Sequence, residues 1–206
     1  PKGLLYWAGH RAGGVKKPFV ENTGCPTGKI IRTRLLDKID RWIEEFFQPD
    51  ITNHRVLLMI GGPGNGKTES VEYFVKQLDK KMNASGELLE NSRAKFAPIP
   101  GSFSPRKCTV DLSTIRGGEK VNFKRLVIVH DATVGDIEEP ELSPEELLIS
   151  ELEHVNNDEE LLFVAGVNRG ILSQTLDEVS SSPDKEQIKK ILIRILSAVT
   201  LSPKQP

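Results

Sequence analysis

One stretch of the sequence predicts the architecture: Arg55-Val56-Leu57-Leu58-Met59-Ile60, which leads directly into Gly61-Gly62-Pro63-Gly64-Asn65-Gly66-Lys67-Thr68. The first part is a continuous apolar run, typical of a strand buried on both faces of a parallel sheet. The second part is a full match to G-x-x-x-x-G-K-[ST], the phosphate-binding P-loop, in which glycines let successive backbone N–H groups face a phosphate. Apolar residues at helical spacing follow from Val71 to Met82. Strand, loop and helix therefore occur in the order that places an anion at a helix N-terminus.

The P-loop match predicts which residues bind a nucleoside triphosphate, with ATP and Mg²⁺ as the expected cofactors and ADP as the product. Lys67 supplies a point charge for the β- and γ-phosphates, and the hydroxyl of Thr68 is a ligand for Mg²⁺. The expected nucleotide-binding set is Gly62, Pro63, Gly64, Asn65, Gly66, Lys67, Thr68 and Glu69.

A second apolar strand is predicted over residues 125–131, where Leu126-Val127-Ile128-Val129-His130 ends in Asp131. In P-loop proteins such a terminal carboxylate holds the magnesium as a Walker B aspartate. We therefore expect Asp131 to bind the metal together with Thr68, and this strand to lie beside the strand over 55–60. His130 fits a packing histidine better than a phosphate sensor.

The remaining pattern alternates strands with helices and predicts an α/β fold, with right-handed crossovers between parallel strands. We expect an extended arm over 1–28, which is rich in glycine and proline, and a core over 29–206. The core would contain a helix over 30–48, a strand over 107–112 and a final helix over 188–199. A helix over 144–156 would begin with a capping box at Ser143. The segment over 83–106 would be mainly a loop, with at most a short helix near Leu88.

The strand predicted over 161–168 supplies a third element, Phe163-Val164-Ala165-Gly166-Val167-Asn168-Arg169-Gly170. With the first two, it resembles the AAA+ ATPase family over about residues 15 to 200. The resemblance implies a three-layer αβα sandwich of the P-loop NTPase type with a mainly parallel sheet. It also implies that Asn168 is the sensor-1 residue, which positions the attacking water, so that Lys67, Asp131 and Asn168 form the catalytic set. The alternative for Asn168 is a cap at the exit of the strand.

Two departures from the AAA+ pattern keep other functions open. Ala132 follows Asp131 where the family usually has the glutamate that activates water, and a methyl group cannot accept a proton. Either Asp136, Glu138 or Glu139 takes this part, or the chain is a nucleotide-binding switch with little hydrolysis. The chain also ends without the helical lid of the family, and only Arg169 and Arg194 are late candidates for an arginine finger. We therefore expect a fragment of a larger multidomain ATPase that converts nucleotide state into conformational change. A P-loop kinase, with its acceptor on the 83–106 loop, is a further alternative.

Composition limits the possible partners. The 206 residues carry a formal net charge of -1, which excludes a globally basic nucleic-acid binder. Charge is nevertheless segregated, because residues 1–38 hold eight basic and two acidic side chains and residues 136–160 hold eleven acidic side chains and no Lys or Arg. Neighbouring subunits or domains are thus the expected partners, and the basic arm would also suit DNA. No apolar run approaches bilayer length, and Cys25 and Cys108 have no zinc or disulfide spacing, so we expect a cytoplasmic, oligomeric protein without a membrane span.

Overall fold

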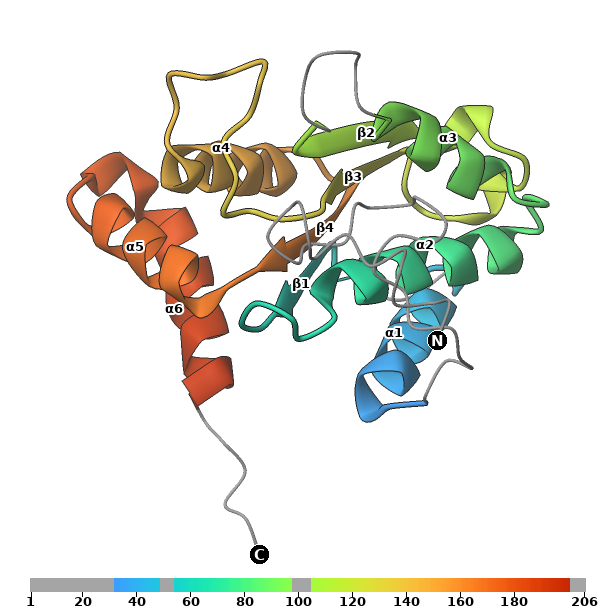
Figure 1. Ribbon diagram of the computed structural model, residues 1–206, viewed down its shortest axis with the longest axis horizontal. Coiled ribbons are helices and arrows are strands. Elements are labelled where there is room, and N and C mark those ends of the chain that lie inside the picture. The colour runs from blue at the N-terminus through green and yellow to red at the C-terminus, as the bar shows by residue number, and fades with distance from the viewer. Residues whose placement is uncertain (1–31, 49–53, 98–104, 201–206) are drawn as a thin grey trace, which may run out of the picture.

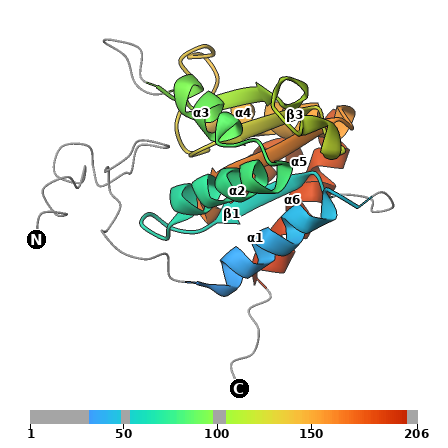
Figure 2. The ribbon, with the colours of Figure 1, turned by 90° about the vertical axis from the view of Figure 1, so that its right-hand side faces the viewer.

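The computed structural model describes residues 32–48, 54–97 and 105–200, so the predicted arm over 1–28 lies outside the described residues (Figure 1). A four-stranded sheet forms the middle layer, with helices on both faces (Figure 2). The architecture is α/β with a mostly parallel open sheet, as the alternation of strands and helices predicts.

The sheet contains β1 (Val56–Ile60), β2 (Lys107–Asp111), β3 (Arg125–Val129) and β4 (Leu161–Val167), in the order β1-β4-β3-β2. The pairs β1–β4 and β3–β4 are parallel. The prediction that β3 lies beside β1 is wrong, because β4 lies between them. All seven residues of β4 are buried, as expected for an inner strand that has a neighbouring strand on each side.

A second difference concerns β2, which pairs with β3 in the antiparallel direction. The connection between β2 and β3 holds only two short 3₁₀ turns, Leu112–Thr114 and Gly118–Lys120. A parallel pairing needs a crossover that carries the chain back across the sheet, usually a helix. The functional consequence is that β2 begins at the edge of the sheet where β3 ends, since Lys107 pairs with Val129.

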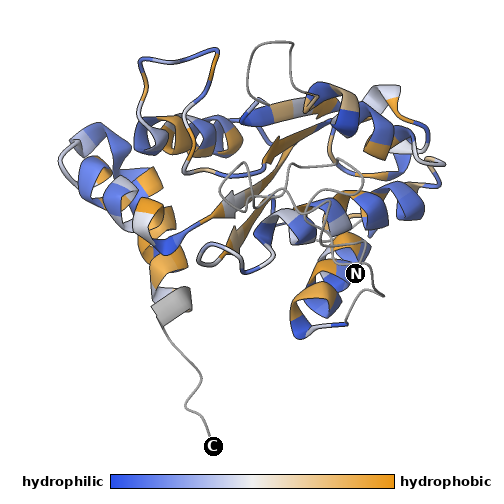
Figure 3. Cartoon of the chain, in the orientation of Figure 1, coloured by the Kyte–Doolittle hydropathy of each residue, from blue (hydrophilic) through white to orange (hydrophobic). Residues whose placement is uncertain are grey.

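Two hydrophobic clusters, one on each face of the sheet, hold the layers together. The first joins α1 (Arg34–Glu45), α2 (Lys67–Met82) and α3 (Glu87–Lys95) to one face, and the second joins α4 (Pro144–Asn157), α5 (Arg169–Ser180) and α6 (Glu186–Thr200) to the other. Along β3, Leu126 and Ile128 belong to the first cluster, whereas Val127 and Val129 belong to the second. Strands therefore bury both faces, and in Figure 3 the inner strands are largely hydrophobic.

The helix predictions hold for α1, α2, α4 and α6, with differences at their ends. The capping box of α4 is present, since Ser143 Oγ accepts from Glu146 N and Glu146 Oε2 accepts from Ser143 N. Within the segment over 83–106, the short helix expected near Leu88 is present as α3 and is nine residues long. Its start is held by Asp79 of α2, whose carboxylate accepts from the N–H groups of Gly86 and Leu88 at 2.8 and 2.9 Å.

Helix α5, which the sequence pattern did not predict, starts directly after β4. Among residues 32–48, 54–97 and 105–200, no helix has both the length and the apolar character needed to cross a bilayer.

Candidate functional site

The glycine-rich loop, residues 61–66, connects β1 to α2 at one edge of the sheet. Gly61 N donates to Val167 O at 3.1 Å, which extends the pairing of β1 with β4 by one residue. Gly64 and Gly66 then adopt φ angles of 78° and 73°, in the left-handed region that side chains other than glycine rarely occupy. A β-carbon at either position would meet nothing within 4 Å. Backbone conformation, and not lack of space, is therefore the reason for these two glycines.

Helix α2 begins immediately after the loop and has no side-chain cap at its N-terminus. Gly66 occupies the capping position and offers no side-chain oxygen to the N–H groups of the first turn. Such N–H groups, together with the helix dipole, attract an anion. The start of α2 is thus suited to a phosphate by its backbone alone.

Lys67, Thr68 and Glu69 form the first turn of α2, and all three are half-buried. The ammonium of Lys67 donates to the carbonyl oxygens of Gly61 at 2.9 Å and Gly62 at 3.0 Å. These contacts hold the Lys67 ammonium over the loop, and no acidic residue of the described part of the chain pairs with it. The same amine could exchange two neutral carbonyls for phosphate oxygens, which form stronger, charge-assisted hydrogen bonds.

The ends of β1, β3 and β4 meet at this edge and bring the predicted catalytic residues together. Ala132 N donates to Gly166 O at 2.8 Å, so the chain after β3 stays beside β4. Gly166 itself lies under Lys67, because a β-carbon there would stand 3.6 Å from Lys67 Cβ. Lys67, Asp131 and Asn168 therefore follow the ends of three neighbouring parallel strands, as predicted for the site.

Asp131 is half-buried, and one of its carboxylate oxygens is engaged locally. Its Oδ1 accepts from Thr133 N at 3.0 Å and from Thr133 Oγ1 at 2.7 Å. Among the described residues, Oδ2 has no hydrogen bond. Within the same part of the chain, no three His, Cys, Asp or Glu residues cluster as a protein-only metal site. One carboxylate and one hydroxyl, from Asp131 and Thr68, nevertheless fit Mg²⁺, which prefers oxygen ligands and completes its shell with water and phosphate.

Asn168 has a structural task at the start of α5. Its Oδ1 accepts from Ile171 N at 2.8 Å and caps the helix, which is the alternative left open by the sequence. The amide nitrogen of Asn168 makes no hydrogen bond to the described residues. Because the Asn168 oxygen is engaged at the helix cap, its NH₂ group is the part of the side chain that can still donate a hydrogen bond at this edge of the sheet.

The position after Asp131 points away from solvent, because Ala132 is fully buried in the second hydrophobic cluster. Two of the three acids considered as substitutes for a glutamate there are held elsewhere. Glu139 Oε2 lies 2.9 Å from Lys107 Nζ, and Asp136 Oδ2 lies 3.8 Å from the same nitrogen. Glu138 is exposed. Neither candidate for an arginine finger is buried, with Arg169 in the first turn of α5 and Arg194 on α6.

His130 is a packing histidine, as predicted. Its Nδ1–H donates to Arg106 O at 2.9 Å, and its ring lies edge-on to Phe96 with centroids 5.5 Å apart. Burial lowers the pKa of His130 below its usual value, although the Arg106 carbonyl and Asp131 oppose this shift. The ring is therefore neutral near pH 7.

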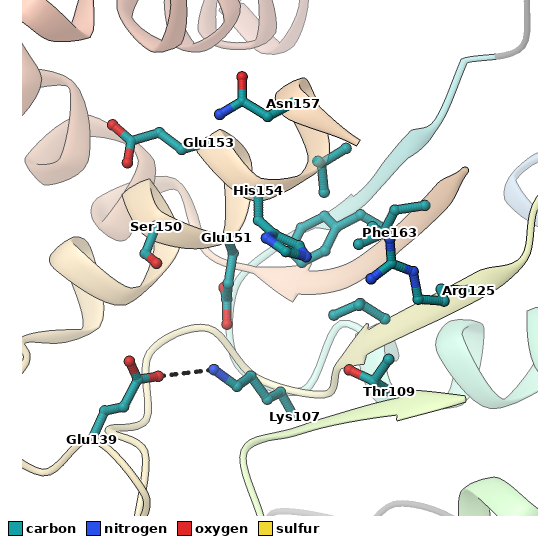
Figure 4. A pocket seen from close by; sticks show the side chains of 13 residues that line it. Lys107, Thr109, Arg125, Glu139, Ser150, Glu151, Glu153, His154, Asn157 and Phe163 are labelled. Carbon is teal, nitrogen blue, oxygen red and sulfur yellow. Dashed lines mark hydrogen bonds and ion pairs between the residues drawn. The ribbon is translucent and has the colours of Figure 1, made fainter. Parts of the chain in front are cut away.

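A pocket of about 440 Å³ lies between α4 and the strands β2, β3 and β4 (Figure 4). None of the residues predicted to bind nucleotide or metal lines it. Next to it, Arg106 forms a buried ion pair with Glu151 of α4. Burial raises the pKa of Glu151, and the Arg106 charge opposes this effect.

Arg106, Lys107 and Glu151 are not predicted as site residues by the sequence pattern. One signal was present, since Glu151 lies midway between Leu147 and Val155 on the apolar side of the predicted helix. A charged residue at such a position needs a buried partner of opposite charge. The identity of that partner, Arg106, depends on the unexpected direction of β2.

No protein-family model, curated protein or solved structure matches the chain.

Proposed function

We propose that the chain is an ATP-binding, Mg²⁺-dependent ATP-hydrolysing module of the AAA+ type, acting as a P-loop NTPase core. The observation that carries this proposal is the meeting of Lys67, Asp131 and Asn168 at one edge of the sheet, beside a helix N-terminus without a side-chain cap. A cation, a metal-binding carboxylate and an amide donor are the groups that phosphoryl transfer requires around a triphosphate.

In the proposed complex, the N–H groups of residues 64–68 would surround the β-phosphate, and Lys67 would move from the Gly61 and Gly62 carbonyls to the β- and γ-phosphates. Thr68 and Asp131 would hold Mg²⁺, which would supply the positive charge that neutralises the phosphate oxygens. The Asn168 amide donates to the attacking water or to the γ-phosphate, while its oxygen keeps the cap of α5. A change at the γ-phosphate would then reach α5 through a single side chain.

A nucleotide-binding switch with little intrinsic hydrolysis is the second candidate function. It is favoured by the burial of Ala132 and by the bonds between Lys107 and the acids Asp136 and Glu139. Of the three candidate acids, these features leave only the exposed Glu138 free of Lys107 to accept a proton from water. In this version a neighbouring subunit or domain of a larger assembly supplies the missing group.

The experiment compares nucleotide binding and single-turnover hydrolysis in three proteins: the natural chain, Lys67→Ala and Lys76→Ala. Lys76 is an exposed lysine on the same helix and serves as the matched control. We expect Lys67→Ala to weaken binding of a fluorescent ATP analogue about 10- to 100-fold, the equivalent of ~1.5–3 kcal/mol for a hydrogen bond to a charged group. Lys76→Ala should bind as the natural chain does.

The two readouts separate the candidates. Release of labelled phosphate, lost in Lys67→Ala, supports the ATPase. Tight binding without release supports the switch. Equal binding by the natural chain and Lys67→Ala contradicts both.

A further inference from the structure

The start of β2 lies beside the end of β3, because the two strands run in opposite directions. Lys107 is the register partner of Val129, the last residue of β3. Arg106, one residue earlier, therefore lies level with His130, and the chain then continues into Asp131. Strand β2 thus begins next to the proposed metal-binding carboxylate.

Arg106 fixes the chain immediately before Asp131. Its carbonyl oxygen accepts from His130 N at 3.3 Å and from His130 Nδ1 at 2.9 Å. The Arg106 side chain is itself immobilised, since it is almost fully buried and paired with Glu151 of α4. A fixed carbonyl that holds both the backbone and the ring of His130 leaves this residue little freedom to turn.

Lys107 fixes the chain after Asp131. Its ammonium contacts Glu139 at 2.9 Å (Figure 4) and lies 3.8 Å from Asp136, so it bridges two acids of the segment that leads from Asp131 to α4. Asp136 is almost completely buried, and its Oδ2 has no hydrogen bond to the described residues. Without the ammonium, the buried Asp136 carboxylate would lose its ion pair with Lys107, and an unpaired buried charge is costly.

We propose that Lys107 is a positioning residue for the Mg²⁺ site: it holds the segment after Asp131 so that the carboxylate faces the glycine-rich loop. This inference rests on the proposed nucleotide-binding function. Lys107 touches neither nucleotide nor metal in this arrangement. It acts through Asp136 and Glu139, in the way that partners of metal ligands tune metal affinity.

The contacts argue against a merely structural role. The pair between Lys107 and Glu139 is 30% and 37% exposed and contributes little to global stability, so the cost of losing Lys107 falls on the buried Asp136 of the same segment. Loss of the Lys107 side chain should therefore leave the fold intact and release only the segment between β3 and α4. That segment carries no regular helix or strand from His130 to Ser143, and beyond Ala132 its hydrogen bonds to the described residues are local apart from the one with Lys107.

The test measures Mg²⁺-dependent binding of a fluorescent ATP analogue by the full chain, alongside binding of the same analogue in excess EDTA. The variants are Lys107→Met, Lys107→Arg and the control Lys124→Met, which removes an exposed ion pair with Glu160 near the opposite end of β3. We expect Lys107→Met to raise the Mg²⁺ concentration for half-maximal binding about tenfold, at the lower end of effects seen for metal-ligand partners. Affinity in EDTA should not change, and Lys107→Arg should restore the natural Mg²⁺ dependence.

Glu139→Gln removes the charge of the other partner in the ion pair with Lys107, and it should also raise the Mg²⁺ concentration for half-maximal binding. A natural Mg²⁺ dependence in both Lys107→Met and Glu139→Gln would overturn the proposal. So would an equal loss of affinity with and without the metal, or a failure of arginine to restore it. If the natural chain binds no nucleotide at all, the proposed function itself is wrong, and this inference is overturned with it.

Discussion

Gly166 of β4 and His130 after β3 lie so close together that a β-carbon on Gly166 would stand 2.5 Å from the carbonyl oxygen of His130. The same β-carbon would lie 3.6 Å from Lys67 Cβ. Glycine is therefore required here by close approach of the backbone, since its φ angle is not in the left-handed region. This contact lets the chain that carries Asp131 pass directly beside the strand under Lys67.

Gly166→Ala should disturb the proposed site and the fold together. The new methyl group forces the His130 carbonyl away, and Asp131 moves with it, at a cost of about 1–3 kcal/mol for overpacking in a filled core. Urea unfolding and Mg²⁺-dependent nucleotide binding measure the two effects. Gly135→Ala is the control, because a β-carbon there meets nothing within 4 Å. If Gly166→Ala unfolds at the same urea concentration as the natural chain, β4 and the chain after β3 can move apart without loss of stability, and the prediction is wrong.

Asp131→Asn should reduce Mg²⁺-dependent binding and hydrolysis while leaving the fold intact. An asparagine oxygen can still accept from Thr133 N and Oγ1, so the local turn is kept, but the negative charge offered to the metal is lost. Titration of Mg²⁺ at fixed nucleotide is the measurement, with thermal unfolding as the check on folding. An unchanged Mg²⁺ requirement would exclude Asp131 as a ligand.

Two substitutions at Asn168 separate its two roles. Asn168→Ala removes the cap of α5 and should cost about 1 kcal/mol of stability. Asn168→Asp keeps an oxygen for Ile171 N but loses the amide donor, so stability should be kept while single-turnover hydrolysis falls. Hydrolysis at the natural rate in Asn168→Asp would leave Asn168 with the capping role alone.

His130 predicts a specific pH dependence of stability. Because burial lowers its pKa below the usual 6.5, the unfolded chain takes up a proton first as the pH falls. The contribution of His130 is therefore complete above pH 6.5 and is lost as the pH falls through the lowered pKa. Urea unfolding between pH 7.5 and pH 5 should show a shallower decline for His130→Gln than for the natural chain. Identical slopes would contradict a buried, neutral ring.

Replacing only one member of the buried ion pair between Arg106 and Glu151 should strongly lower the stability of the fold. Arg106→Met leaves Glu151 buried without its partner and should destabilise the chain by about 3–5 kcal/mol, whereas the double variant Arg106→Met, Glu151→Leu should be less destabilised. Equilibrium unfolding of both proteins gives the comparison. A double variant weaker than the single one would show that the pair itself stabilises the fold.

Local pattern was sufficient to predict much of this structure. The apolar runs before Gly61 and before Asn168 form β1 and β4, and the capping box at Ser143 starts α4. The same pattern brought Lys67, Asp131 and Asn168 to one edge, because the carboxyl ends of parallel strands share an edge. Their proposed chemistry stays a prediction.

The features that were missed depend on contacts between distant segments. The start of α3 is held by Asp79 from another helix, which a reading of residues 83–106 alone could not reveal. The direction of β2 follows from a connection without a crossover helix. Arg106 and Lys107 became visible as site residues only once that direction was known.

The order of the strands also has a consequence for synthesis of the chain. In the described sheet β1 pairs only with β4, the last of the four described strands to leave the ribosome, so the glycine-rich loop is made before the strand that supports it. Such long-range pairing slows folding, because a large loop must close before any contact forms. A nascent chain halted before Leu161 would contain the complete loop motif but not the strand that supports it. The proposed nucleotide binding should therefore begin abruptly during translation, once β4 has emerged.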